Sequence, residues 1–163
     1  MLTALQEALA EAHGLAISAA STLDRVEERV LDGRLRRDLG AMRLDANELR
    51  ARCLEVERWL GEELAAEILA RANTVAEQAS DLALAWFKAG TGPLSAWGFL
   101  AMGEAGEVAA WAALEALSRG EGPESVAELA AWALPVQRRH LQLALDGCAL
   151  LAEAIDPASP RWG

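Results

Sequence analysis

Residue types that build β-sheets, disulfides and catalytic sites are scarce in this sequence. Its 163 residues include no tyrosine, two phenylalanines, two histidines and two cysteines. No alternating run of β-branched residues is present, so no β-strand is predicted. No stretch of about 18 uncharged apolar residues occurs either, which excludes a membrane-spanning helix. The composition therefore predicts an all-α protein that does not enter a membrane.

Basic residues are too few to form a large positive surface. Lysine and arginine total 15 against 25 aspartates and glutamates, for a formal net charge of -10. Nucleic acids and anionic lipids both require a concentrated basic face, so both are excluded as partners. Residues 1–7 lack the basic and apolar segments of a signal peptide, which favours a cytoplasmic location.

The few cysteines and histidines limit the chemistry further. Cys53 and Cys148 are far apart and are interpreted as buried free thiols, with neither a zinc knuckle nor a redox CxxC pair. His140 and His13 have no candidate nucleophile beside them, and His13 is interpreted as incidental. The glycines form no phosphate-binding loop. Hydrolase and nucleotide-binding activities are therefore excluded.

What the sequence does contain is helical periodicity. Thr3 is a typical N-cap, and the first helix is expected to end near Asp32–Gly33, with Gly33 as a left-handed C-cap. A second helix carries apolar residues spaced by threes and fours: Leu35, Leu39, Met42, Ala46, Leu49, Cys53, Val56 and Leu60. The short connection between the two helices predicts an antiparallel hairpin.

Glycine and proline divide the rest of the chain. Gly61 is expected to break or bend the chain before a third helix over residues 62–89, and Pro93 begins a fourth helix that ends at Ser118. A short helix over 124–134 is followed by Pro135, which is expected to kink or restart it. The last helix ends at 156–157, with its core face at Leu141, Leu145, Cys148, Leu151 and Ile155. These patterns predict one elongated helical bundle over residues 1–157 and a flexible tail over 158–163.

Two glutamates interrupt an apolar seam in the fourth helix. Glu104 and Glu107 fall on the same helical face as four large apolar residues, Trp97, Leu100, Trp111 and Leu114. Like charges one turn apart repel, and a buried unpaired carboxylate is strongly destabilising or takes up a proton. A metal ion, an arginine, a histidine or water is therefore expected opposite this pair.

Two further helices carry polar pairs with the same three-residue separation. These are Asp45 with Glu48 and Gln137 with His140. Inward-facing pairs of this kind build the carboxylate-bridged two-metal sites of four-helix bundles. Each pair also has a structural interpretation. Glu104 and Glu107 would pair with an arginine or face solvent, and His140 would hydrogen-bond to a neighbouring residue. Asp45 and Glu48 would lie at a solvated edge of the bundle, with Arg52 beside Glu48.

At these residues the sequence resembles a distant member of the ferritin-like superfamily, in particular the YciF-like, stress-associated group. The third bundle helix of that group carries a Glu-His-x-Glu run followed by apolar residues and an aromatic. Here Glu104, Glu107 and Trp111 match, and Ala105 replaces the histidine. The resemblance implies a ferritin-like four-helix bundle of two antiparallel hairpins. It also implies that the helix over 62–89 is an additional long crossover, a placement that the sequence alone leaves open.

Other positions depart from the pattern of the group. Met42 and Asp45 stand where its second helix carries His-x-x-Glu, and Ala16 falls near its first-helix glutamate. On the last helix, where the group carries acidic residues, the candidate positions here hold only Gln137 and His140. The resemblance thus implies a metal site reduced to Glu104, Glu107, His140 and Asp45. No bound cofactor is expected, with iron or manganese as the alternative.

Tryptophans and glycines suggest a second kind of site. Trp86, Trp97, Trp111 and Trp132 are many large aromatics for this composition, and most are expected in the core. The fourth helix also keeps three interior glycines, Gly98, Gly103 and Gly106, as happens where a helix approaches closely or a large group needs room. A pocket for a flat or apolar ligand is predicted at Trp97, Trp111, Gln137 and Met42.

Three functions fit these observations. The first is a non-catalytic ferritin-like bundle with a degenerate metal site, acting as a binding or interaction module and forming a homodimer. The second is a metal-dependent oxidoreductase of the di-iron or manganese type, or a metal-storage protein. The third is a carrier of a small apolar ligand.

Overall fold

The chain folds into five long helices, as described by a computed structural model that covers residues 1–120 and 122–158. They are α1 (Ala4–Glu27), α2 (Gly33–Trp59), α3 (Glu62–Trp86), α4 (Pro93–Ser118) and α5 (Glu124–Glu153). Within the described residues there is no strand, which confirms the all-α prediction. In the same part of the chain, no helix has the length and apolar composition needed to span a bilayer. Except for Ala158, the tail expected at 158–163 lies outside the described residues.

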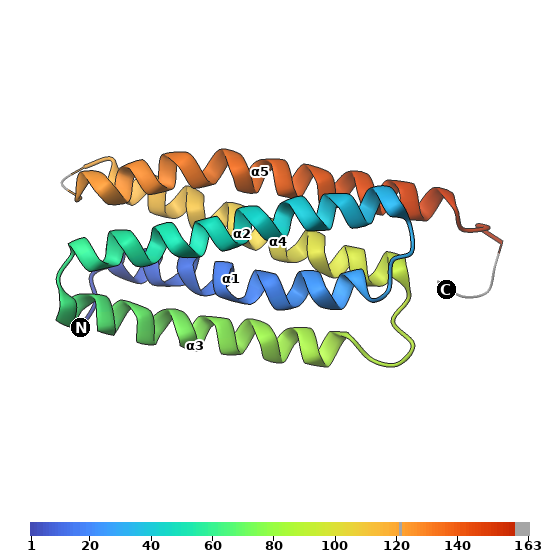
Figure 1. The fold of residues 1–163 in the computed structure, drawn as a ribbon, viewed down its shortest axis with the longest axis horizontal. Coiled ribbons are helices and arrows are strands. Elements are labelled where there is room, and N and C mark those ends of the chain that lie inside the picture. The colour runs from blue at the N-terminus through green and yellow to red at the C-terminus, as the bar shows by residue number, and fades with distance from the viewer. Residues whose placement is uncertain (121, 159–163) are drawn as a thin grey trace.

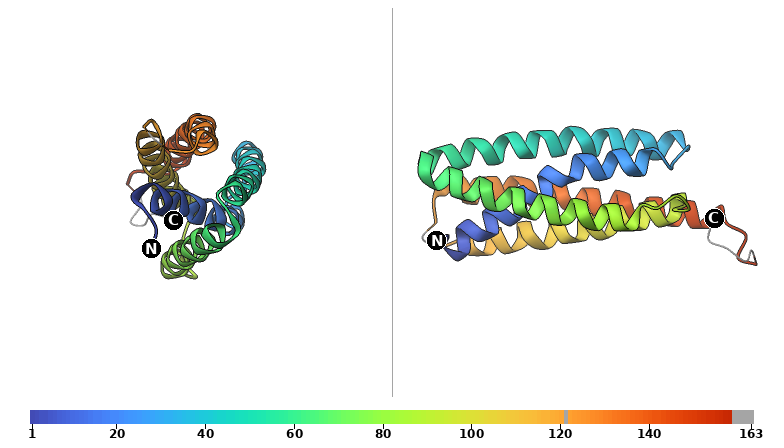
Figure 2. Two further views of the ribbon diagram at one scale, coloured as in Figure 1. Left: turned by 90° about the vertical axis from the view of Figure 1, so that its left-hand side faces the viewer. Right: turned by 90° about the horizontal axis from the view of Figure 1, so that it is seen from below.

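Four of the helices form a bundle, and the fifth packs on its outside. α1 contacts α2 and α4, and α5 contacts the same two helices, so that α1, α2, α5 and α4 close a ring around the core. α3 packs along α1 and over a shorter stretch of α2. Successive helices run antiparallel (Figure 1), and the end-on view shows α1 between α3 and the α4/α5 hairpin (Figure 2). α3 thus joins the α1/α2 hairpin to the α4/α5 hairpin along the outside.

Several predicted helix ends are confirmed by their caps. Thr3 caps α1 through a capping box with Gln6, in which each side chain bonds the backbone N–H of the other residue. Gly61 separates α2 from α3 with a φ of 103°, a conformation that glycine adopts without the steric penalty of a side chain. α4 begins at Pro93 and ends at Ser118, as predicted.

The connection between α1 and α2 differs from the prediction. α1 already ends at Glu27, and Asp32 caps the start of α2 by accepting hydrogen bonds from the backbone N–H groups of Arg34 and Leu35. Gly33 is the first residue of α2 and has no positive φ, so it is not a left-handed C-cap. The aspartate decides the boundary because its carboxylate satisfies two free donors at the helix start.

Pro135 does not divide the last helix. α5 runs unbroken from Glu124 to Glu153, so the separate short helix over 124–134 is wrong. Because proline has no N–H, the carbonyl of Ala131 loses its helical hydrogen bond. Pro135 and Ala131 both lie on the exposed side of α5, where water can bond to that carbonyl.

The core face of α5 is also rotated from the predicted one. Beyond His140 the buried residues of α5 are Ala144 and Gly147, whereas Leu145 is about half exposed. Gly147 is required there because a Cβ would overlap the indole of Trp97, a fully buried side chain of α4. A small residue, which a pattern of large apolar residues does not reveal, therefore leaves room on α5 for the indole of α4.

Candidate functional site

The two glutamates of α4 lie inside the bundle. Glu104 is 3% exposed and Glu107 is 5% exposed, and the four apolar residues of the same seam are also buried. The predicted face of α4 is therefore confirmed. Because two carboxylates are removed from water together, the question is what satisfies their oxygens.

The polar pair of α5 lies opposite these glutamates. Gln137 Nε2 donates a hydrogen bond to Glu107 Oε2 at 2.8 Å, and His140 Nδ1 lies 3.6 Å from Glu104 Oε2. Both α5 residues are buried. Of the three polar pairs predicted to face one another, these two meet, and the partners of the glutamates are an amide and an imidazole.

His140 also connects the glutamates to the edge of the bundle. Its Nε2 lies 2.9 Å from Asp45 Oδ2 of α2, which also accepts a 2.7 Å hydrogen bond from Arg139. The Asp45 side chain is 28% exposed. Asp45, His140 and Glu104 thus form a row that leads from solvent into the core. Glu48, by contrast, pairs with Arg52 at the surface, as its structural interpretation predicted.

The environment shifts several pKa values in this row. Burial lowers the pKa of His140, but the carboxylates of Glu104 and then Asp45 outweigh it, so its pKa is raised. Burial raises the pKa of Asp45, but His140 and Arg139 outweigh this effect and lower it. Burial, and then the charge of Glu104, raise the pKa of Glu107 well above its usual range. The arrangement favours a proton on His140 and on Glu107, and none on Asp45.

These residues do not fit a two-metal centre. Among the described residues, no group of three or more histidine, cysteine, aspartate or glutamate side chains is placed to hold a metal ion. At Glu107 the amide of Gln137 presents an N–H donor, and a metal ligand needs a lone pair instead. Met42 and Ala16, on the other two bundle helices, are buried and supply no charged oxygen or imidazole ligand.

The predicted tryptophan pocket is a packed core. Trp97, Trp111, Gln137 and Met42 are each at most 1% exposed, and Trp97 Nε1 donates a 2.7 Å hydrogen bond to the carbonyl of Ala144. The prediction that these four residues line an open pocket is therefore wrong. It failed because large aromatic residues fill space in this bundle.

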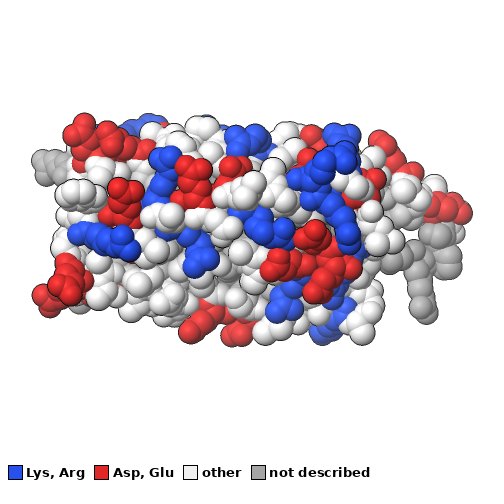
Figure 3. Space-filling model, viewed as in Figure 1, with Lys and Arg blue, Asp and Glu red and all other residues white. Residues whose placement is uncertain are grey.

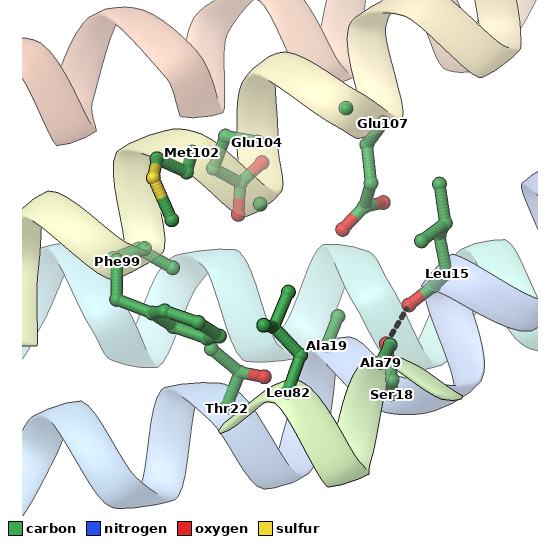
Figure 4. Close-up of a pocket in the computed structure, with 13 residues that line it drawn as sticks. Leu15, Ser18, Ala19, Thr22, Ala79, Leu82, Phe99, Met102, Glu104 and Glu107 are labelled. Atoms are coloured by element: carbon green, nitrogen blue, oxygen red, sulfur yellow. Dashed lines mark hydrogen bonds between the residues drawn. The ribbon is translucent and has the colours of Figure 1, made fainter. Parts of the chain in front are cut away.

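A cavity lies elsewhere, between α1, α3 and α4. It has a volume of about 210 Å³, and Glu104 and Glu107 contribute to its lining (Figure 4). Gly103 and Gly106 also line it, and a Cβ at either position would meet no atom within 4 Å. The glycines of α4 therefore leave open space, and none of the three marks a close helix contact.

A second buried polar pair was missed by the sequence analysis. His13 of α1 and Glu57 of α2 are 1% and 2% exposed, and His13 Nδ1 lies 2.6 Å from Glu57 Oε1. Burial, followed by the charges of Glu57 and Glu107, raises the pKa of the neighbouring Cys53 thiol. His13 is therefore a core residue. The sequence does contain a signal for this burial. His13 follows the core residue Leu9 by four positions, and Glu57 follows the core residue Cys53 by four.

Comparison with known proteins adds no relative. No protein-family model, no curated protein and no solved structure matches this chain.

Proposed function

We propose that this protein is a non-catalytic, ferritin-like helical bundle with a degenerate metal site, and that it acts as a binding module. The ferritin-like part of the proposal is supported by the connectivity, since two antiparallel hairpins are joined by a helix that runs outside the bundle. The two cysteines in the described residues are both free, which suits a reducing cytoplasm.

One observation carries the non-catalytic part of the proposal. The groups that would bind metals already bind one another: Gln137 donates to Glu107, and His140 lies between Asp45 and Glu104. A di-iron centre of this superfamily uses four carboxylates and two histidines from four helices. Here α1 offers Ala16 at the corresponding level, and the amide of α5 satisfies a carboxylate without a metal.

Metal analysis tests this proposal. In protein purified without chelators or an affinity tag, we expect iron, manganese and zinc far below one equivalent per chain. We expect the double variant Glu104→Gln/Glu107→Gln to fold and to be at least as stable as the wild type, because it removes two buried charges while keeping their shape. Near-stoichiometric metal that disappears in the double variant would instead support the metal-dependent oxidoreductase or metal-storage alternative.

The homodimer is proposed on the outer face of α4. This face consists of exposed residues without charge: Met102, Ala105, Ala109, Ala113 and Ala116. An uncharged outer face of this kind on a helix favours burial against a partner. α4 lies behind α2 in Figure 1, and the opposite face of the molecule carries interspersed acidic and basic side chains (Figure 3). A second copy, which has the same net charge of -10, meets the least repulsion at the uncharged face.

Substitution on this face tests the dimer. We expect the wild type to have the mass of a dimer in light scattering coupled to size exclusion, and Ala109→Arg to be a monomer. Arginine has nearly the helix propensity of alanine, so α4 should persist. Ala66→Arg, at an exposed position of α3, is the matched control and should remain dimeric. A monomeric wild type, or a dimeric Ala109→Arg, would contradict the proposal.

A further inference from the structure

The cavity between α1, α3 and α4 has mostly apolar walls. Leu15 and Ala19 come from α1, Leu82 comes from α3, and Phe99 comes from α4 (Figure 4). Its volume of about 210 Å³ exceeds that of an engineered cavity of about 150 Å³ that accommodates benzene. The cavity therefore has room for a ring or a short branched chain.

The cavity also has one acidic end. Glu104 and Glu107 extend from α4 toward the same space as Leu15 and Leu82 (Figure 4). Glu104 is 97% buried, and its Oε2 accepts no hydrogen bond. A buried carboxylate oxygen without a donor is strongly destabilising, so its position beside open space points to a donor supplied from outside the chain.

Among the described residues, no side chain that lines the cavity supplies that donor. The lining contains no lysine, arginine or histidine. α1 and α3 contribute alkyl side chains and two hydroxyls, of which Ser18 donates to the carbonyl of Leu15. His140 approaches Glu104 from α5 and is not part of the lining. Glu104 therefore has His140 on its α5 side, with Nδ1 3.6 Å from Oε2 and beyond hydrogen-bond distance, and it accepts no hydrogen bond from the described residues of the lining.

We propose that this cavity binds an organic ammonium ion with a small apolar body. The ammonium group donates to Glu104 and Glu107, and the apolar body packs against Phe99, Leu82 and Leu15. The inference rests on the proposed binding function and specifies the class of ligand. Gly103 and Gly106 contribute by leaving the space beside the two carboxylates open.

Other ligand classes fit this cavity less well. An anion would meet two carboxylates. A neutral apolar molecule would leave Glu104 Oε2 without a donor. Calcium takes six to eight oxygen ligands, whereas apolar walls and two carboxylates supply far fewer. An alkyl or aryl ammonium ion satisfies both ends of the cavity at once.

The surrounding titratable groups make binding depend on pH. The groups near the site are Glu104 and Glu107 of α4, His140 of α5, and Asp45 and Cys53 of α2, while α1 and α3 place none in the lining. The pKa of Glu107 is raised by burial and by Glu104, so an ammonium ion must displace its proton. His140, whose pKa is also raised, competes for Glu104 while it is protonated. Both effects make affinity increase as pH rises, until the ligand itself loses its proton.

Calorimetric titration of the full chain tests the inference. We expect 2-phenylethylammonium to bind with 1:1 stoichiometry per chain and with proton release. We expect 2-phenylethanol to bind about tenfold or more weakly, because a hydrogen bond to a charged group is lost. Phenylacetate should not bind. Equal affinity for the ammonium ion and the alcohol, or no binding of the ammonium ion, would overturn the inference.

Variants separate the two ends of the cavity. Glu104→Gln should remove the preference for the ammonium ion over the alcohol, a ratio that does not depend on the folded fraction of the sample. Ala19→Phe should fill the cavity and abolish binding of both molecules. Glu63→Gln, an exposed position of α3, is the matched control and should leave the preference unchanged. An unchanged preference in Glu104→Gln would show that the ammonium binds elsewhere.

Manganese chloride serves as the final titrant. Tight binding of manganese, lost in Glu104→Gln, would overturn both this inference and the non-catalytic function proposed above. Absence of binding by both manganese and 2-phenylethylammonium would overturn only the ligand inference. The two proposals can therefore fail independently.

Discussion

Replacing Gly147 by alanine is expected to destabilise the protein by about 3 kcal/mol, the upper end of the range for overpacked cores. The added Cβ would overlap Nε1 and Cε2 of Trp97 and lie 2.6 Å from its Cζ2. The indole is fully buried and is held by its hydrogen bond to the carbonyl of Ala144. Because Trp97 has no free space in which to move, α4 and α5 must separate.

Denaturant unfolding of Gly147→Ala beside Gly98→Ala measures this effect. Gly98 is also a glycine inside a helix, but a Cβ there meets no atom within 4 Å. Its replacement should stabilise the protein by about 0.5 to 1 kcal/mol, through helix propensity and a less flexible unfolded chain. Equal free energies of unfolding for the two variants would contradict the packing described for Trp97.

Replacing His13 by alanine is expected to destabilise the protein by about 3 kcal/mol. His13 Nδ1 and Glu57 Oε1 are 2.6 Å apart, and both side chains are at least 98% buried. The substitution leaves a carboxylate in the core without its donor and opens a cavity where the imidazole stood. Both effects act in the same direction, so this loss should rank among the largest for a polar residue of this chain.

Glu57→Gln is the matched control for His13→Ala. The amide oxygen of glutamine can still accept the hydrogen bond from Nδ1, so a loss of about 1 kcal/mol or less is expected. The double variant should be less destabilised than the sum of the two single variants, because the pair is lost only once. Additive losses would show that His13 and Glu57 contribute independently.

Helix ends were predicted correctly where one residue decides the backbone conformation. Thr3 acts through a side-chain cap, Gly61 through a positive φ, and Pro93 through its fixed φ. All three lie at helix boundaries. The prediction failed where two signals compete. At Asp32–Gly33 the aspartate starts a helix more strongly than the glycine ends one, and at Pro135 exposure of the helix face offsets the missing N–H.

The buried site was predicted in part. Glu104 and Glu107 are evident from the sequence because a charged pair inside a large apolar seam breaks the helical pattern. Three polar pairs were expected to face one another, and the fold brings Gln137 and His140 to these glutamates while Glu48 stays at the surface. Glu57 was missed because its neighbour Val56 fits the seam equally well by spacing, although Glu57 is the residue that is buried.

The cavity was predicted only in part. Its lining includes Gly103 and Gly106, which the sequence indicated as leaving room or allowing a close contact, and the small residues Ala19 and Ala79, which do not stand out in a pattern of large apolar residues. The tryptophans that do stand out, Trp97 and Trp111, fill the core completely. Only the three-dimensional arrangement distinguishes a large residue that lines a space from one that fills it.

Because α3 lies outside the bundle, the molecule has two unfolding steps, local unfolding of α3 and global unfolding of the bundle. α1, α2, α4 and α5 contact one another without α3, although α3 adds Ile68 and Ala83 to the core, so we expect local unfolding of α3 to require less free energy than global unfolding. Detachment would also remove one wall of the cavity, to which α3 contributes Ala79 and Leu82. Any molecule held against this wall therefore stabilises the docked state of α3.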